Sequence, residues 1–278
     1  YGTQMARATY HGVKRFAYPK RPFVITRSAY SGAQRYTSSW TGDNVATWEH
    51  LWIANIQVQR MCISGMGFTG SDIGGFAEQP SGELYARWIQ LGVFHPFCRT
   101  HSSGDHGNQE PWAFDEEVID ITRKFVNLRY QLLPYLYTMF WQYIEEGIPM
   151  LKPLVYYDQD DIQTHYRNDE FIFGNQILVC PILEPNSLGR RMYIPRGQWY
   201  NYWTNELISG GKEVWVDTKF DQIPVFVKAG AIIPKYPVQQ YVGEIDFDEL
   251  TLDLYFKEGK EKSEIYEDAQ DGYDYKKG

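Results

Sequence analysis

The pattern of hydrophobic and polar positions divides the chain near Tyr157. Before this residue, stretches with apolar residues at helical spacing alternate with short, continuous apolar runs. After it, short apolar runs are separated by Gly, Pro and Asn. A helical period predicts amphipathic helices, whereas short apolar runs between turn residues are typical of strands. The first part therefore predicts a mixed α/β unit, and the second part predicts antiparallel β structure.

The first part predicts helices and strands in alternating order, beginning with a helix. The predicted helices cover residues 1–16, 48–61, 82–91 and about 115–147, the last interrupted by Pro134 and closed by Gly147. The predicted strands are Phe23–Ile25, Met66–Phe68, Val93–Phe97 and Met150–Tyr156. Because Phe23–Ile25 is apolar without interruption, it predicts a parallel strand that is buried on both faces.

Three of these predicted strands are followed by polar residues, which include Arg27, Asp72 and His101. Alternating strands and helices predict a parallel sheet covered by helices. In α/β barrels the carboxyl ends of the strands carry the active site, and open doubly wound sheets bind ligands at the same ends. The pattern therefore predicts a functional site at these ends and leaves the choice between a barrel and an open sheet undecided.

The second part predicts an antiparallel sandwich followed by a further β segment. Apolar runs at residues 250–256 and 263–266 predict the first strands of another β module. The predicted domains are residues 1–157, 158–240 and 241–278. The predicted sandwich strands are Phe171–Phe173, Ile177–Val179, Met192–Ile194, Val214–Val216, Val225–Val227 and Ile232–Ile233.

Composition excludes several classes of protein. The 278 residues include 27 Lys+Arg and 35 Asp+Glu, and the net charge of −8 gives no electrostatic footprint for nucleic acid. No apolar run reaches the roughly 20 residues that a membrane span needs. Cys62, Cys98 and Cys180 are too few and too widely separated to form a disulfide framework. Aromatic residues make up 17%, which fits either a sugar-stacking pocket or exposed sheet surfaces.

Two short motifs favour ordinary structural roles. Gly65–Gly70 matches G-x-G-x-x-G, but a dinucleotide site needs a strand before the glycines and a helix after them, and here the order is reversed. Cys98, His101, Asp105 and His106 lack the second ligand cluster that usually completes a zinc site. Neither motif therefore implies a metal or a cofactor.

An acidic motif lies near the end of the chain. Asp268, Asp271 and Asp274 have the spacing of a calcium loop, but the Glu that should close such a loop is absent. A solvated acidic turn, with Asp271 and Gly272 as a hairpin signal, is the favoured interpretation.

Asp43 and Asp72 are the candidate reactive carboxylates. Asp43 follows Trp40-Thr41-Gly42, and its alternative role is that Asp43 or Asn44 caps the next helix. Asp72 precedes two glycines, which allow the backbone to approach a ligand closely, and its alternative role is that of a turn residue. The position of both residues beside strand ends favours a functional role.

At these residues the chain resembles glycoside hydrolase family 31, the α-glucosidase and α-xylosidase family. The resemblance covers nearly the whole chain. It implies an α/β fold: the second half of a (β/α)8 TIM barrel, comprising its fifth to eighth strands, then an antiparallel β-sandwich and the start of a distal β module. It is carried by the blocks Arg21–Ser28, Trp40–Asn44, Gly70–Phe76 and Phe97–His101.

The family resemblance implies a role for each matching residue. Family 31 uses a retaining mechanism with two carboxylates that flank the scissile bond. By similarity, Asp43 is the general acid/base, which protonates the departing oxygen and then deprotonates the incoming water or sugar. The substrate-binding residues around the sugar in subsite −1 are, by similarity, Arg27, Trp40, Asp72, Phe76 and His101, and no cofactor or metal is implied.

The family's nucleophile, an aspartate in a W-x-D-M-x-E block, is absent from this sequence. We therefore expect a fragment of a larger enzyme, with an oligosaccharide or α-glycoside substrate and with the missing N-terminal part of the same enzyme as its partner. The expected activity is that of a retaining, exo-acting α-glycosidase, with α-glucosidase as the first candidate. The alternatives are an α-glucosyltransferase or α-xylosidase of the same family, or a non-catalytic carbohydrate-binding chain.

Overall fold

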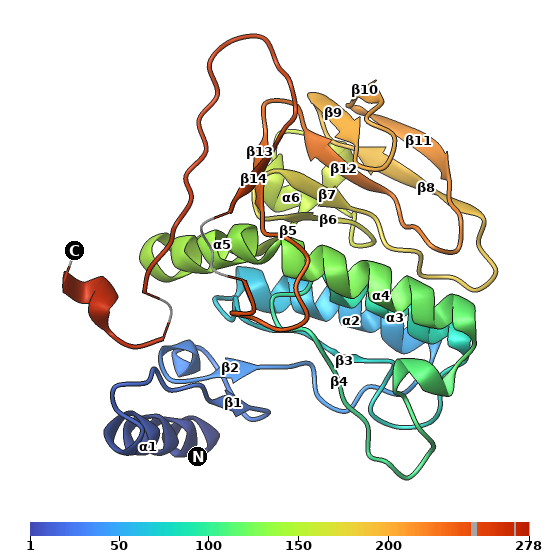
Figure 1. Ribbon diagram of the computed structural model, residues 1–278. Helices are drawn as coiled ribbons and strands as arrows, with labels where there is room; N and C mark the ends of the chain where they lie inside the picture. The colour runs from blue at the N-terminus through green and yellow to red at the C-terminus, as the bar shows by residue number, and fades with distance from the viewer. Residues whose placement is uncertain (246–248, 270, 278) are drawn as a thin grey trace.

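The computed structural model describes residues 1–245, 249–269 and 271–277. A layer of helices lies in the middle of the molecule, with short parallel strands on one side and antiparallel sheets on the other (Figure 1). No helix in the described part of the chain is long and apolar enough to cross a membrane.

The predicted helices are confirmed, and the residues at their ends explain their limits. Thr47, Ser81 and Asp115 precede helices, and each side chain accepts a hydrogen bond from the backbone N–H three residues later. A break at Leu132 divides the long helix just before Pro134, and Gly147 ends it in the left-handed conformation. The main helices are α1 (Gly2–Phe16), α2 (Trp48–Ile63), α3 (Gly82–Gly92), α4 (Glu116–Gln131) and α5 (Leu133–Glu146).

The parallel strands form two pairs. The predictions of strands at Met66–Phe68 and Val93–Phe97 are wrong, because the strands begin after these runs, at Asp72 and Arg99. Phe23 is 59% exposed, and Val24 and Ile25 are only half-buried, so the prediction of a strand buried on both faces is wrong. The rings of Phe23, Phe68 and Phe97 instead contact one another, with centroids 6.1–6.4 Å apart. The pairs are β1 (Ile25–Thr26) with β2 (Ser38–Ser39), and β3 (Asp72–Ile73) with β4 (Arg99–Thr100).

Strand β2 was not predicted because its two residues are serines, which carry no apolar signal. Its hydrogen bonds explain why the segment is extended: the Ser39 hydroxyl donates to the Thr26 carbonyl, and the Ser38 N–H donates to the Val24 carbonyl. Only the short 3-10 helix η1 (Ala33–Arg35) connects β1 with β2. The loop that follows β2 carries Asp43, so β2 determines where this carboxylate lies.

The sheet on the other side of the helices has six strands in the order β10-β9-β12-β7-β6-β5. The predicted strand Met150–Tyr156 ends at Pro153, after which residues Leu154–Tyr157 form helix α6. Every predicted strand from Phe171 to Ile233 is confirmed as part of a strand. The strands of the sheet are β5 (Leu151–Pro153), β6 (Phe171–Phe173), β7 (Ile177–Val179), β9 (Gln198–Asn201), β10 (Leu207–Ser209) and β12 (Val225–Lys228).

The central strands of this sheet are buried on both faces because different layers cover them. Side chains alternate along a strand, so Phe171 and Phe173 join the core formed with the helices, while Ile172 joins a second core. The second core also contains residues of β8 (Gly189–Ile194), which pairs with β11 (Lys212–Asp217) on the far side of the sheet. The sheet is therefore attached to the helical layer through a continuous apolar core.

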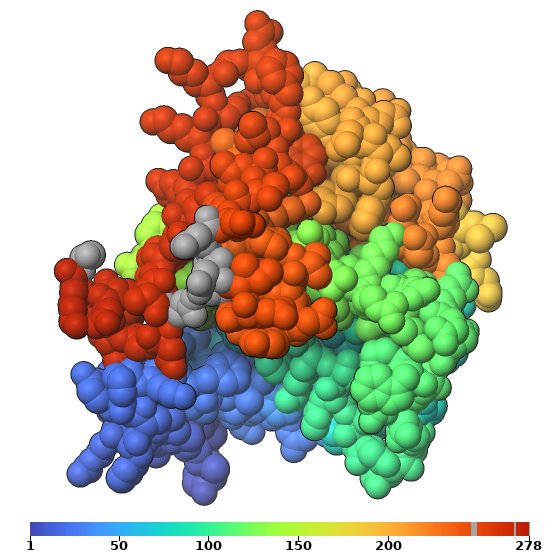
Figure 2. All heavy atoms as spheres, in the orientation of Figure 1, coloured from blue at the N-terminus to red at the C-terminus, as the bar shows by residue number. Residues whose placement is uncertain are grey.

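The end of the chain differs from its predicted form. Strand β14 (Thr251–Leu254) pairs with β13 (Ile232–Lys235), which confirms the predicted strand near residue 250, but Ser263–Tyr266 is not a strand. No strand pair flanks Gly272 in the described segments, so the predicted hairpin is not present there. The predicted acidic turn is not fully solvated, because the Asp268 side chain is 3% exposed and binds Arg21. In Figure 2 this red C-terminal segment lies against the blue N-terminal residues.

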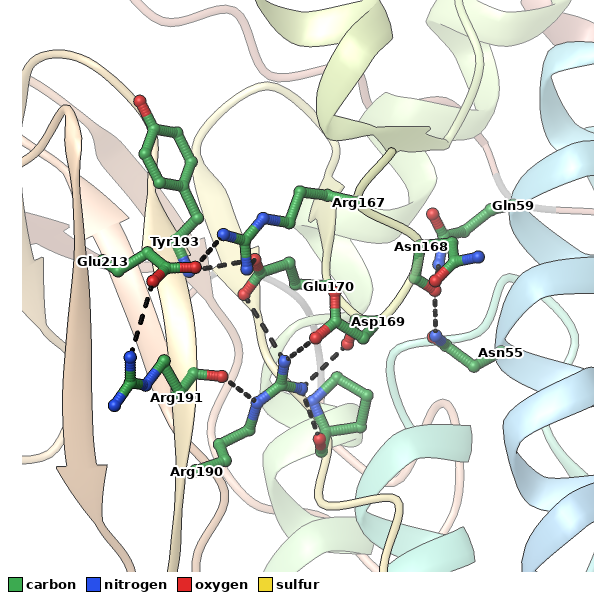
Figure 3. Close-up of polar contacts among 11 residues, drawn as sticks. Asn55, Gln59, Arg167, Asn168, Asp169, Glu170, Arg190, Arg191, Tyr193 and Glu213 are labelled. Carbon is green, nitrogen blue, oxygen red and sulfur yellow. Dashed lines mark hydrogen bonds and ion pairs between the residues drawn. The ribbon is translucent and has the colours of Figure 1, made fainter. Parts of the chain in front are cut away.

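Polar contacts join helix α2 to the second core (Figure 3). The Asn55 side chain donates to the Asn168 carbonyl at 2.8 Å, and Arg190 donates to the Asp169 carbonyl at 2.9 Å and also pairs with the Asp169 carboxylate. The segment between α6 and β6 therefore bridges the helical layer and the antiparallel pair β8–β11.

Glu170 is the buried centre of this bridge. Its carboxylate accepts a hydrogen bond from the Tyr193 N–H at 3.0 Å and lies 3.7 Å from both Arg167 and Arg190. Burial raises the pKa of Glu170 to about 7, with a further rise from the neighbouring Asp169 carboxylate, and the two arginines and the Tyr193 N–H offset only part of the effect. The buried carboxyl therefore retains its proton to a higher pH than it does in the unfolded chain.

This gives a testable pH dependence. Between about pH 4.5 and 7 the unfolded state releases the Glu170 proton while the folded state keeps it, so Glu170 lowers stability progressively as pH rises. Glu170→Gln replaces the titratable carboxyl with an amide. We expect the free energy of unfolding of this variant, relative to that of the parent, to rise by up to roughly 3 kcal/mol between pH 4.5 and 7.5. Urea titrations of the variant and the parent at several pH values measure this difference in the free energy of unfolding. Glu145→Gln, at an exposed position, is the control, and a difference that stays constant across this range would contradict the prediction.

Candidate active site

Arg27 and Asp43 meet where the paired strands β1 and β2 end. Arg27 follows β1 and Asp43 follows β2, and the parallel pairing brings these two strand ends together. The Arg27 Nη1 lies 2.9 Å from the Asp43 Oδ2, and the two side chains are 63% and 45% exposed. The predicted acid/base carboxylate is therefore accessible from solvent and already paired with a cation.

The backbone fixes the loop that carries Asp43. The Asn44 carbonyl accepts hydrogen bonds from the Phe76 and Ala77 N–H groups, and the Ala46 N–H donates to the Ala77 carbonyl. These contacts bind the loop after β2 to the loop after β3. Thr47 is the N-cap of α2, so the alternative that Asp43 or Asn44 caps this helix is wrong.

Asp72 lies beneath this surface. Its side chain is 0% exposed, and Arg99 binds its Oδ1 through Nε at 3.1 Å and Nη2 at 3.0 Å. Burial raises the pKa of Asp72, an effect that Arg99 and His101 oppose and the charge of Asp43 reinforces. Asp72 begins strand β3, and its carbonyl also accepts a hydrogen bond from the Gly75 N–H at 3.1 Å, so Asp72 is also the first residue of a turn.

Aromatic rings complete the surface around Asp43. The rings of Phe76 and His101 lie 5.4 Å apart at an angle of 35°. The Arg99 guanidinium lies over the Trp40 ring, 5.1 Å from its centroid. The structure therefore brings all the predicted site residues into one region at the strand ends, and their individual roles stay predictions.

Two glycines allow the loops of this region to approach closely. A Cβ on Gly70 would lie 1.8 Å from the Phe97 carbonyl oxygen, and a Cβ on Gly75 would lie 2.6 Å from the Ala46 backbone. Gly75 also has a φ of +89°, which side chains disfavour. Close backbone packing thus holds the ends of β3 and β4, and the Asp43 loop, against one another.

The cavity beside helix α5 is not part of this region. The described residues contain no group of three or more His, Cys, Asp or Glu side chains arranged to hold a metal ion. A cavity of about 590 Å³ is lined by α5 and by the C-terminal segment, including Phe140, Tyr137 and Asp268, and by none of the predicted site residues. The site near Asp43 is thus an open surface of the chain and is separate from this cavity.

The chain matches two descriptions of one enzyme family. Residues 1–139 match the Glycosyl hydrolases family 31 TIM-barrel domain, and residues 147–233 match the Glycosyl hydrolase family 31 C-terminal domain. The chain belongs to glycosyl hydrolase family 31. The family resemblance deduced from the sequence is therefore confirmed, and the fold is a portion of the family's TIM barrel followed by its C-terminal domain.

Relatives within family 31 are α-glucosidases. Alpha-glucosidase 2 of Bacillus thermoamyloliquefaciens is 39% identical over 279 residues, which cover 100% of this chain and 35% of the relative. Neutral alpha-glucosidase AB of Sus scrofa is 34% identical and is matched over 100% of this chain and 30% of its own length. The chain thus spans about a third of the length of these relatives.

Solved structures of family 31 enzymes have the same fold. A mutant Flavobacterium johnsoniae GH31 dextranase complexed with isomaltotriose has a TM-score of 0.94 and 32% identity, covering 100% of this chain and 36% of the dextranase. The glucosidase II alpha subunit in its Tris-bound form has a TM-score of 0.95 and 31% identity, covering 99% of this chain and 31% of that subunit.

Arg99 was not among the predicted site residues of this family 31 chain. The sequence contained a signal for it, because Arg99 lies two residues before His101 in one of the family-like blocks. Its partners could not be deduced from that position. The structure shows that Arg99 contacts both Asp72 and Trp40.

The close approach at Gly70 gives a second prediction. Gly70→Ala places a methyl group against the Phe97 carbonyl, so strands β3 and β4 must separate. We expect the free energy of unfolding to fall by more than about 2 kcal/mol. Gly12→Ala in helix α1 is the matched control, because its Cβ meets nothing within 4 Å, and it should raise stability by up to about 1 kcal/mol. Urea titration measures both, and equal effects would contradict the prediction.

Proposed function

We propose that this chain forms part of a retaining, exo-acting α-glucosidase, in which Asp43 is the general acid/base and the nucleophile is supplied by sequence outside the chain. The observation that carries the proposal is the half-exposed Asp43 carboxylate, bound to Arg27 at the joined ends of β1 and β2. The α-glucosidase relatives support the activity, and the third of their length that the chain spans supports a larger enzyme.

We also propose the finer architecture that this function requires. Strands β1 to β4 correspond to the fifth to eighth strands of a (β/α)8 barrel, a view supported by their parallel pairing and by helices α2, α3 and α4, which follow β2, β3 and β4. The six-stranded sheet and the β8–β11 strand pair that covers it correspond to an antiparallel β-sandwich. The proposed domains have the predicted limits 1–157, 158–240 and 241–278, with β5 of the first domain pairing with β6 of the second and β14 of the third pairing with β13 of the second.

The chemistry follows from two carboxylates on opposite sides of the glycosidic bond. In a retaining enzyme one carboxylate attacks the anomeric carbon while the other protonates the leaving oxygen; the second group then removes a proton from the water that releases the sugar. Asp43 can serve as the second group because its exposed side chain can reach a substrate. Arg27 restricts the orientation of the Asp43 carboxylate, and its remaining N–H groups can donate to sugar hydroxyls.

Aromatic and imidazole groups would bind the sugar next to Asp43. Phe76 and His101 lie side by side, so they offer an apolar face and a hydrogen-bonding nitrogen together. Trp40 adds a second apolar surface. We propose glucose as the sugar in subsite −1 because the related enzymes are α-glucosidases, and because a dextranase with the same fold was solved with isomaltotriose.

Two alternatives within the family need a direct assay. An α-xylosidase would prefer p-nitrophenyl α-xyloside over p-nitrophenyl α-glucoside, and an α-glucosyltransferase would make longer oligosaccharides at high maltose concentration. The full-length protein that contains this chain should hydrolyse the glucoside and release glucose from maltose. Failure to turn over any α-glycoside would refute the proposal and favour a non-catalytic carbohydrate-binding chain.

The role of Asp43 predicts a dependence on the leaving group. Asp43→Ala should lower kcat/KM on maltose by about 10²–10⁴-fold, because its glucose leaving group needs a proton. The loss should be much smaller on α-glucosyl fluoride, because fluoride departs without protonation. Steady-state kinetics on both substrates measures this difference.

Asp120→Ala is the matched control for this experiment. Asp120 is an exposed aspartate on helix α4, paired with Arg123, and its removal should change neither rate by more than about twofold. Equal losses on maltose and on the fluoride in Asp43→Ala would show that Asp43 is not the proton donor.

A further inference from the structure

The burial of Asp72 argues against the direct contact with sugar that the family resemblance implies. Its side chain is 0% exposed, so a substrate at the surface does not reach it. Its Oδ1 is occupied by two N–H groups of Arg99, and its Oδ2 is buried without a hydrogen-bond partner in the described part of the chain. The Asp72 carboxylate thus binds the Arg99 guanidinium.

Arg99 extends from this buried carboxylate toward the surface. Its guanidinium lies between two rings, 5.1 Å from the centroid of Trp40 and 5.2 Å from that of Phe97. Its side chain is 28% exposed. A planar guanidinium can bind a carboxylate along its edge and stack on aromatic rings with its faces, which an ammonium group cannot do. Arg99 therefore connects Asp72 with Trp40.

Trp40 belongs to the same loop as the proposed acid/base. Only two residues separate it from Asp43, and the Thr41 N–H between them donates to the Gly70 carbonyl at 3.0 Å. Gly70 in turn lies two residues before Asp72. The backbone hydrogen bond thus joins the loop of Trp40 and Asp43 to the first residue of the segment Gly70–Asp72, and the Asp72–Arg99 pair fixes the last residue of that segment. A shift of the Asp72–Arg99 pair would therefore move the Trp40 ring relative to Asp43.

We propose that Asp72 and Arg99 are positioning residues for the glycosidase reaction: Asp72 holds the Arg99 guanidinium against Trp40, and Trp40 is thereby fixed beside Asp43, while Asp72 makes no contact with the sugar. This inference rests on the proposed function and deepens it. Small displacements of reacting groups reduce the rate strongly, because catalysis depends on the geometry in the transition state.

The kinetic test uses the full-length protein and a set of substrates that each lack one hydroxyl. Asp72→Asn, Arg99→Lys and the double variant are assayed on p-nitrophenyl α-glucoside and on its 2-, 3-, 4- and 6-deoxy derivatives. We expect each single variant to lower kcat by about 10–100-fold with KM changed less than threefold, and by the same factor on every substrate. The double variant should be no slower than the slower single variant, because both act through one contact.

A second measurement reports the position of Trp40 without any turnover. In protein labelled with 5-fluorotryptophan, Trp40→Phe identifies the Trp40 fluorine signal. Asp72→Asn and Arg99→Lys should both shift this signal. If the parent turns over no α-glucoside, the proposed function has failed, and the fluorine signal then decides the positioning role by itself. Arg99→Lys, at a partly exposed side chain, keeps the test available if Asp72→Asn does not fold.

Three results would overturn the inference. A deoxy substrate on which Asp72→Asn has no effect would identify a direct contact between Asp72 and the missing hydroxyl. Losses that multiply in the double variant would show that the two residues act independently. A Trp40 signal unchanged in both single variants would show that the pair does not position the ring. The surface pair Arg123 and Asp120, changed to Lys and Asn together, is the matched control and should alter kcat less than twofold.

Discussion

Parallel pairing between very short strands is the constraint on which the site depends. Each of the four strands β1 to β4 has only two residues, yet this pairing aligns the carboxyl ends of neighbouring strands and thus the loops that follow them. The Arg27–Asp43 ion pair forms across the first pair of strands, and the Arg99–Asp72 pair forms across the second. An isolated bridge between Val45 and Ala77 then connects the loops of the two pairs.

Such short strands need support from elsewhere in the chain. Helices α2 to α5 cover them from one side, and the same helices pack against the six-stranded sheet through one continuous core. Ile73 of β3 lies in that core beside helix residues, and a Cβ on Gly92 would lie only 2.4 Å from the Ile73 side chain. The C-terminal domain is therefore part of the support that keeps the strand ends in place.

The sequence predicted the elements whose signals are local. Helical periodicity, Pro134 and Gly147 predicted the two helices α4 and α5, and short apolar runs predicted most strands of the large sheet. Strand β2 escaped detection because Ser38 and Ser39 owe their conformation to partners in β1, which are distant in sequence. The prediction of a strand at Ser263–Tyr266 was wrong for the opposite reason. The local pattern of this segment resembles a strand, but the segment pairs with no other strand in the described part of the chain.

The site shows the same division between local and distant information. Family-like blocks predicted Arg27, Asp43 and His101 as site residues, and their roles stay predictions. The burial of Asp72 depends on packing against residues distant in sequence, such as Arg99, and could not be deduced from sequence. Arg99 lies inside one of the family-like blocks, Phe97–His101, but the sequence gives no sign of its partners. Its contacts with Asp72 and Trp40 distinguish it from an ordinary surface arginine. Long-range packing thus determines which of these polar side chains are exposed and which are buried.

A crystal structure of the full-length protein with glucose bound would show whether Asp43 lies where a proton donor must be. We expect the anomeric oxygen to lie within hydrogen-bond distance of the Asp43 carboxylate, with Arg27 and His101 at the same sugar and Asp72 still bound to Arg99 out of its reach. Glucose bound away from these strand ends, or an Asp43 side chain turned away from the anomeric oxygen, would contradict this expectation.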